Sequence, residues 1–144
     1  MKKIFAVALI AVLAIALVAC GGSTYKDGTY TAQSDAPHYD WTDTLSVTYK
    51  DGKVVEAKYD AFNADNALKS TMTADTYPMD PLPSDWIPKL DANIVAAGSS
   101  DKIEAVAGAT NSSNTAKLLM AAIEEAAKKG DTNTQMVTLP SEEG

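Results

Sequence analysis

The sequence pattern that most constrains the fold lies in residues 114–129, which predict a long amphipathic helix. Apolar residues recur there at helical spacing: Ala116, Leu119, Met120, Ile123 and Ala127. Gly130 follows the last of them and is a typical helix stop. A helix with one apolar stripe needs a second layer to bury that stripe, so the rest of the chain must supply one.

Alternating apolar and polar side chains predict three half-buried strands, at residues 29–34, 45–49 and 53–59. The last two strands flank the dipeptide Asp51-Gly52 and are expected to form a hairpin. These strands supply the second layer that the helix requires.

The loop of this hairpin is predicted from the pairing that it imposes. A three-residue loop over residues 50–52 pairs Val47 with Val55 and keeps apolar side chains on one face. A two-residue loop would pair Val47 with Glu56 instead. We therefore expect the three-residue loop, with a type I turn and Gly52 left-handed in a bulge.

A second helix is predicted over residues 84–97, where apolar residues again recur at helical spacing. Ser84 or Asp85 can cap its start, and Pro88 then falls in its first turn. Gly98 is expected to end it.

The remaining segments are shorter or irregular. Residues 63–73 could hold a helical turn or two, whereas residues 77–83 contain three prolines and exclude regular structure. Residues 103–106 predict a short strand, and residues 135–139 are a candidate edge strand within a polar, acidic tail at 131–144. The sum is a single α+β two-layer domain, a small antiparallel sheet packed against two main helices.

The N-terminus reads as a processed lipoprotein signal. Lys2 and Lys3 precede an apolar run over residues 4–19, and Cys20 follows that run directly. This arrangement resembles a bacterial lipobox, which implies diacylglycerol on Cys20 and cleavage before it. The alternatives are a retained membrane anchor and an ordinary cleaved signal.

The lipobox interpretation divides the chain into four parts. These are a signal peptide at 1–19, a lipidated cysteine and short tether at 20–24, a folded domain at 25–130 and an acidic tail at 131–144. The protein is then expected at the extracytoplasmic face of the cell membrane, anchored by lipid and not spanning the bilayer.

Charge and cysteine content exclude several classes of protein. The chain has 144 residues, and its 12 basic residues are all Lys. Removing Lys2 and Lys3 leaves 10 Lys against 19 acidic residues, a net charge of −9. Nucleic acid is therefore not an expected partner. Because Cys20 is the only cysteine, no disulfide can form within the mature chain.

The sequence predicts no metal site and no catalytic residues. His38 is the only histidine and has no spaced cysteines around it, so zinc and haem are poorly supported. The nucleophile elbow of serine hydrolases, the phosphate-binding P-loop and the dinucleotide-binding glycine motif do not occur.

Aromatic residues gather outside the predicted strands, at Tyr39, Trp41, Tyr77 and Trp86. One interpretation is that they cap a small core. The other is a platform for a flat aromatic ligand, because stacking needs large faces held on rigid turns. Residues 77–86, which also contain Met79 and Leu82, are the better candidate since their prolines pre-order the loop.

Residues 104–114 are the strongest candidate for a binding site. The stretch is apolar up to Thr110, turns at Gly108, and continues into hydroxyl and amide side chains before the predicted helix. The free N–H groups at a helix start can bind an anion, and Thr110 adds a hydroxyl there. The alternative is an ordinary helix capped by Ser112 or Ser113.

This stretch resembles the motif of the FMN-binding domain family, on residues 107–113, Ala-Gly-Ala-Thr-Asn-Ser-Ser. The family includes the flavin-carrying subunits of sodium-pumping NADH:quinone reductase and of the Rnf complex, and small flavin lipoproteins of extracellular electron transfer. Residues 27–30, 50–54 and 86–90 are also similar to that family. The resemblance covers residues 25–129.

The resemblance implies that a flavin transferase joins FMN through its phosphate to Thr110, although non-covalent FMN is also possible. Glu104 and Gly108 would help the transferase to recognise the site. Glu104 stands where the family has Asp, and Ala107 where it has Ser or Thr. The expected cofactor-binding residues are Gly108, Ala109, Thr110, Asn111, Ser112, Ser113, Tyr77, Met79, Leu82 and Trp86.

The expected function is that of a lipid-anchored flavoprotein that relays electrons between an unidentified donor and acceptor. Its partners would be the flavin transferase and the membrane. No general acid or base is needed, so we do not expect an enzyme with its own substrate. The alternatives are a lipoprotein that binds a ligand or partner without redox function, and a flavin-dependent reductase of a small acceptor.

Overall fold

The computed structural model describes residues 24–140. The predicted signal peptide and Cys20 lie outside the described residues. Within residues 24–140, no helix combines the length and the apolar character that a membrane span requires.

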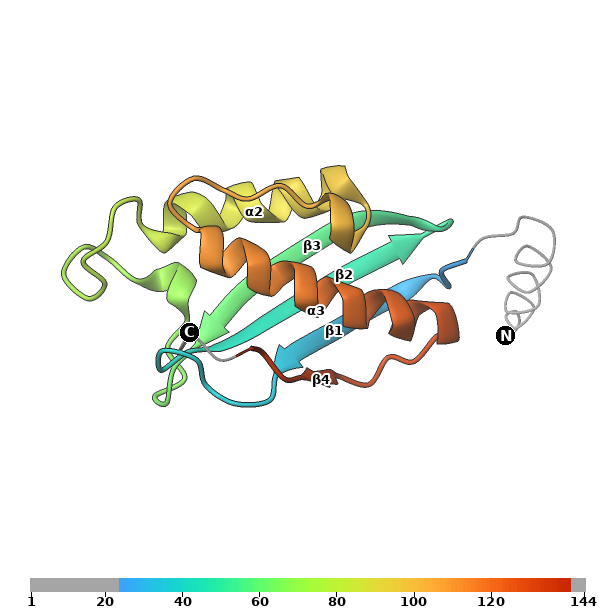
Figure 1. Cartoon of the computed structure of the whole chain (residues 1–144), viewed down its shortest axis with the longest axis horizontal. Helices are drawn as coiled ribbons and strands as arrows, with labels where there is room; N and C mark the ends of the chain where they lie inside the picture. The colour runs from blue at the N-terminus through green and yellow to red at the C-terminus, as the bar shows by residue number, and fades with distance from the viewer. Residues whose placement is uncertain (1–23, 141–144) are drawn as a thin grey trace, which may run out of the picture.

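The sheet has four strands in the order β3-β2-β1-β4. They are β1 (Gly28–Ser34), β2 (Thr42–Lys50), β3 (Lys53–Phe62) and β4 (Gln135–Val137). The first three pair antiparallel, as predicted, but β4 pairs parallel with β1, so the sheet is mixed. The helix that precedes β4 runs antiparallel to β1 (Figure 1). The chain that leaves this helix therefore turns back and enters the sheet parallel to β1.

The predicted three-residue hairpin loop is wrong, although Gly52 is left-handed as expected. Lys50 pairs with Lys53, which leaves Asp51 and Gly52 as a two-residue turn with φ angles of 54° and 80°. Positive φ at both central positions matches the twist of the flanking strands, which favours this short turn over the three-residue loop.

A two-residue turn with regular pairing would place Glu56 opposite Val47, and a bulge in β3 avoids this pairing. The register shifts between Thr48 and Tyr49, and Val55 is the extra residue on β3. As a result, Val47 pairs with Ala57 rather than with Val55 or Glu56. Ala57 therefore faces the core, while the side chain of Val55 is 52% exposed.

The first main helix, α2 (Pro83–Ala97), begins earlier than predicted. Leu82 is its N-cap residue, not Ser84 or Asp85, and Pro83 occupies the first position, where no N–H partner is needed. Pro88 accordingly lies in the second turn. Gly98 ends the helix with φ 71°, as predicted.

The second main helix, α3 (Thr110–Lys129), also begins earlier than residue 114. Ala109 is its N-cap residue, so the predicted caps Ser112 and Ser113 are wrong. The predicted apolar stripe is buried along its whole length, and Gly130 ends the helix with φ 74°.

Residues 103–106 do not form the predicted strand. Their backbone is held by side chains instead, because Asn93 Nδ2 donates to the carbonyl of Glu104 at 2.9 Å and Val106 N donates to Ser113 Oγ at 3.0 Å. A short 3₁₀ helix, η2 (Ser100–Lys102), precedes them. Another, η1 (Lys69–Thr71), lies in the segment where a helical turn was expected.

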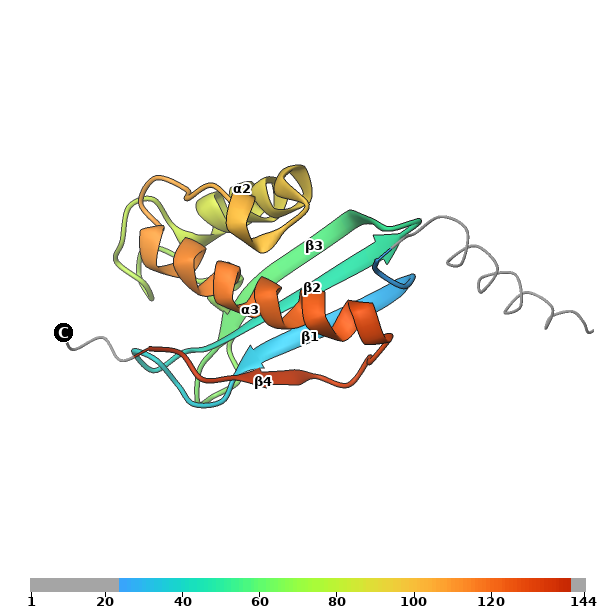
Figure 2. The same ribbon diagram turned by 45° about the vertical axis from the view of Figure 1, so that its right-hand side comes forward.

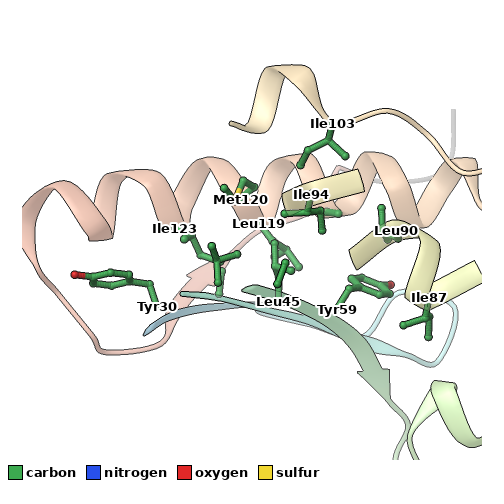
Figure 3. Packing of buried hydrophobic residues seen from close by; sticks show 14 of the residues in the cluster. Tyr30, Leu45, Tyr59, Ile87, Leu90, Ile94, Ile103, Leu119, Met120 and Ile123 are labelled. Atoms are coloured by element: carbon green, nitrogen blue, oxygen red, sulfur yellow. The ribbon is translucent and has the colours of Figure 1, made fainter. Parts of the chain in front are cut away.

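Both main helices pack on the same face of the sheet, which confirms the predicted two-layer α+β domain (Figures 1 and 2). Figure 3 shows the core between the layers, with Leu45 and Tyr59 on the sheet facing Leu90, Ile94 and Leu119 on the helices. The core therefore fixes the position of α3 over the sheet.

The two ends of α3 lie at opposite ends of the domain. The described chain begins beside the C-terminal end of this helix, where Lys26 N donates to the carbonyl of Ala127 at 2.9 Å. Thr110 lies at the other end, near the loops that connect β1 to β2 and β3 to α2 (Figure 1).

Candidate functional site

A cavity of about 430 Å³ opens at the N-terminal end of α3. Residues from three parts of the chain line it, within 38–43, 69–86 and 108–115. Its volume is in the range of small-molecule binding sites. The loops that carry these residues meet at the left-hand end of the domain in Figure 2.

The structure brings most of the predicted cofactor-binding residues to this cavity. Those that line it are Gly108, Ala109, Thr110, Asn111, Ser112, Tyr77, Met79 and Trp86. Leu82, Ser113 and Glu104 do not line it. Leu82 precedes α2 and is half-buried, Ser113 is buried inside the domain, and Glu104 is exposed beside a second, smaller pocket.

Ser113 is a structural residue of the helix start. Its hydroxyl donates to the carbonyl of Ala109 at 2.8 Å and accepts from Val106 N at 3.0 Å. These two bonds tie the segment before Gly108 to the first turn of α3. They therefore fix the direction in which α3 presents its N-terminus.

The N-terminus of α3 is not capped by a side chain, and its first turn contains no acidic residue. Ser113 N bonds to the carbonyl of Ala109, so the N–H groups of residues 110–112 have no acceptor among the described residues. Such N–H groups and the helix dipole together stabilise a negative charge. Thr110 is exposed at this point.

Gly108 brings the proline-rich loop against this helix start. Its φ is 87°, and a Cβ atom at this position would lie 2.5 Å from Pro81 Cδ. Both the backbone conformation and the contact therefore require glycine. Residues 77–82 are irregular, as predicted, whereas Pro83 already belongs to α2. The irregular residues form one wall of the cavity through Tyr77 and Met79.

Aromatic side chains form much of the cavity wall. The ring centroids of Trp41 and Tyr77 are 6.0 Å apart, with an interplanar angle of 57°. Trp86 is 1% exposed, and its Nε1 has no hydrogen-bond partner within the described chain. Trp41 reaches the cavity because it pairs with His38 across a tight turn at Tyr39 and Asp40, which both have positive φ.

Sequence reasoning missed Lys69. This lysine is 7% exposed, and its Nζ lies 5.0 Å from the ring centroid of Trp41, 5.7 Å from that of Tyr77 and 6.0 Å from that of Trp86. Burial lowers the pKa of Lys69, and the nearby carboxylates of Asp43 and Asp60 oppose that shift. No local pattern distinguishes Lys69 from the exposed lysines, because only tertiary packing places it here.

Asp43 is the second missed charge, at 5% exposure. The hydroxyl of Tyr59 donates to its carboxylate, and its backbone N–H donates to Ser34 Oγ at 3.0 Å. Burial raises the pKa of Asp43, whereas the Tyr59 hydrogen bond and the charges of Lys69 and His38 lower it. The cavity thus contains one buried acid and one buried base. No cluster of acidic, histidine or cysteine residues suited to a metal ion occurs in residues 24–140.

The arrangement can hold a flat aromatic ligand that carries a negative group. Aromatic faces surround the space, and the open end of α3 and Lys69 provide positive charge. The assignment of FMN to this space remains a prediction.

Known proteins resemble this chain in sequence and in structure. Over 125 residues the chain is 31% identical to the 15 kDa lipoprotein of Treponema pallidum (strain Nichols), covering 83% of this chain and 88% of that protein. Its structure is similar to the crystal structure of the CPE2226 protein from Clostridium perfringens, with a TM-score of 0.73 and 33% identity, over 81% of this chain and 99% of that chain. No protein-family model matches the sequence.

Proposed function

We propose that this chain, which belongs to the family of the 15 kDa lipoprotein of Treponema pallidum, is a lipid-anchored extracytoplasmic protein that carries FMN and relays electrons. The name of the relative and the apolar run that ends at Cys20 support the lipid anchor. The cavity and the motif at its edge support the flavin.

The observation that carries the flavin proposal is the position of Thr110. Its hydroxyl is exposed at the first residue of an uncapped helix, and the same residue lines an aromatic cavity. The N–H groups of residues 110–112 would hold the phosphate of FMN. Trp41, Tyr77 and Trp86 would provide apolar faces for its ring. When bound, FMN supplies the redox chemistry.

Two observations test whether the residues fit this cofactor. The volume of about 430 Å³ suits a ligand of that size class. The Nε1 of Trp86 is a buried donor without a partner, which an acceptor on a bound ligand could satisfy. Glu104 is exposed, so it is accessible to a flavin transferase even though it lies outside the cavity.

The test is the mass of the mature protein after expression together with a flavin transferase. We expect an increment of one FMN in the wild type and in Thr110→Ser, and none in Thr110→Ala. Thr132→Ala, which changes an exposed threonine outside the cavity, should keep the increment.

A second measurement covers non-covalent binding. The two tryptophans, Trp41 and Trp86, both line the cavity, so their fluorescence should be quenched when FMN is added to protein without flavin. A protein that gains no mass and whose tryptophan fluorescence does not respond to FMN would contradict the proposed function.

A further inference from the structure

We propose that Lys69 sets the charge preference of the cavity: its ammonium group favours a ligand ring that carries negative charge over the neutral form of the same ring. This inference rests on the proposed function in one respect, that the ligand is a flavin. A flavin ring is neutral when oxidised and becomes an anion when it takes up two electrons and one proton. Lys69 would therefore bind the reduced ring more tightly and raise the reduction potential.

The position of Lys69 is built into the fold. The carboxylate of Asp60, on β3, accepts from Ser70 N at 3.0 Å and from Ser70 Oγ at 2.6 Å. Leu68 forms a bridge with Phe62 at the end of the same strand. These contacts hold η1 against β3 on both sides of Lys69. The backbone of Lys69 is therefore held in place where its side chain enters the cavity.

The ammonium group of Lys69 has no anionic partner at contact distance. Lys69 makes no ion pair within residues 24–140, although it is almost fully buried. A buried charge without a partner is costly, and the faces of Trp41 and Tyr77 compensate for only part of that cost. A negative charge on a ligand in this space would supply the missing partner.

The other charged groups near the cavity do not cancel Lys69. Asp43 faces the same space, but it makes no ion pair with Lys69 within residues 24–140, and its carboxylate accepts from the hydroxyl of Tyr59. The carboxylate of Asp60 accepts hydrogen bonds from Ser70. His38 also lines the cavity and adds no negative charge. Lys69 therefore opposes, at short range, the net charge of −7 of the whole chain.

The phosphate and the ring would interact with different positive groups. The open N-terminus of α3 provides N–H groups for the phosphate, whereas Lys69 lies among the aromatic rings. Riboflavin, which lacks the phosphate, should therefore show the same dependence on Lys69 as FMN. This separates the role of Lys69 from general attraction of an anionic ligand.

The experiment compares the reduction potential of the bound flavin, measured by spectroelectrochemistry, in the wild type, Lys69→Met and Lys89→Met. Lys89 is an exposed lysine on α2 outside the cavity, so its variant makes the same change in net charge. We expect the affinity ratio of reduced over oxidised flavin to fall at least tenfold in Lys69→Met, which is about 30 mV for a two-electron couple. The Lys89→Met variant should match the wild type.

The outcomes separate this inference from the proposed function. A wild type and a Lys69→Met variant that both hold flavin at the same potential would overturn the role of Lys69 and leave the flavin proposal standing. A wild type that takes up neither FMN nor riboflavin would overturn both. Because Lys69 is buried, Lys69→Gln provides a second neutral replacement, and an unchanged potential in whichever variant folds also counts against the inference.

Discussion

At the scale of single residues, Gly108 joins the proline-rich loop to the start of α3. Its φ is positive, and a Cβ atom there would lie only 2.5 Å from Pro81 Cδ, so any side chain disturbs this junction. Gly98 has a similar φ of 71°, but a Cβ there would meet open space. Substitution of Gly98 therefore tests the cost of the backbone conformation alone, whereas substitution of Gly108 adds the cost of the contact with Pro81.

We expect Gly108→Ala to lower the free energy of unfolding by about 3 kcal/mol and Gly98→Ala by about 1 kcal/mol. The larger loss reflects the contact with Pro81 in addition to the strained φ. Urea denaturation of both variants measures the difference. Equal losses would show that the loop moves away from Gly108 at little cost.

Because of Asp91, we expect the free energy of unfolding to fall as the pH rises. Burial raises the pKa of its carboxyl to about 6, although Tyr59 N donates to Asp91 Oδ1 at 2.8 Å and opposes the shift. Between the unfolded pKa and pH 6 the folded state holds the proton that the unfolded state has lost, so stability decreases over this range.

Asp91→Asn keeps the acceptor for Tyr59 N and removes the charge. We expect this variant to be more stable than the wild type at pH 8 by about 1 kcal/mol, a value discounted for the half-exposed position of the group. The advantage should disappear at pH 4, where Asp91 is protonated. Thermal unfolding at the two pH values checks both statements.

The residues of the cavity were only partly predictable from the sequence. Thr110 and Gly108 belong to a contiguous stretch, so a local pattern identified them. Lys69 and Asp43 come from separate segments, and nothing near them in the sequence signals that a charge is buried. Their role depends on the packing of η1 and β2 around the aromatic side chains.

At the scale of secondary structure, Ser113 anchors the first turn of α3. We expect Ser113→Ala to lower the free energy of unfolding by about 2 kcal/mol, because Val106 N then loses its acceptor in a buried position. Asn114→Ala, at the exposed neighbouring position, should change it by less than about 0.5 kcal/mol. Guanidinium denaturation of the two variants tests this, and similar values would contradict a specific role for the Ser113 hydroxyl.

Elements with a long periodic pattern were predicted well, and short ones were not. The stripe of α3 recurs over several turns, so its burial followed from spacing alone. In the hairpin, the favoured two-residue turn and the burial of apolar side chains on one face require different pairings. A bulge at Val55 allows both. Residues 103–106 are apolar enough for a strand, but the side chains of Asn93 and Ser113 take the hydrogen bonds that a strand would need.

At the scale of the whole molecule, the sheet includes a strand beyond residue 130, where we placed the domain boundary. The candidate edge strand at residues 135–139 is present as β4. β4 pairs with β1 through Gln135, Met136 and Val137, and Val137 packs against the core. Asp35 N also donates to the carbonyl of Val137 at 2.9 Å. The segment after α3 is therefore part of the sheet and not only a tail.

A chain that ends at Gly130 should lose about 2 kcal/mol of stability, because it gives up this pairing and exposes the edge of β1. A chain that ends at Pro140 should unfold like the full mature protein. Differential scanning calorimetry of the two truncated chains measures the effect. Identical melting temperatures would show that β4 contributes nothing to the fold.

The length of α3 sets how far the cavity stands from the start of the domain. Its 20 residues span about 30 Å, with the described N-terminus at one end and Thr110 at the other. The three residues between Cys20 and Thr24 add a reach of at most about 14 Å. If Cys20 carries lipid, this tether is shorter than α3. A domain that stands with the C-terminal end of α3 toward the membrane then presents its cavity to the aqueous side. Under the proposed function, a redox partner that stays within the bilayer would not reach the cavity in this orientation, whereas a soluble partner or a tall membrane-bound partner would.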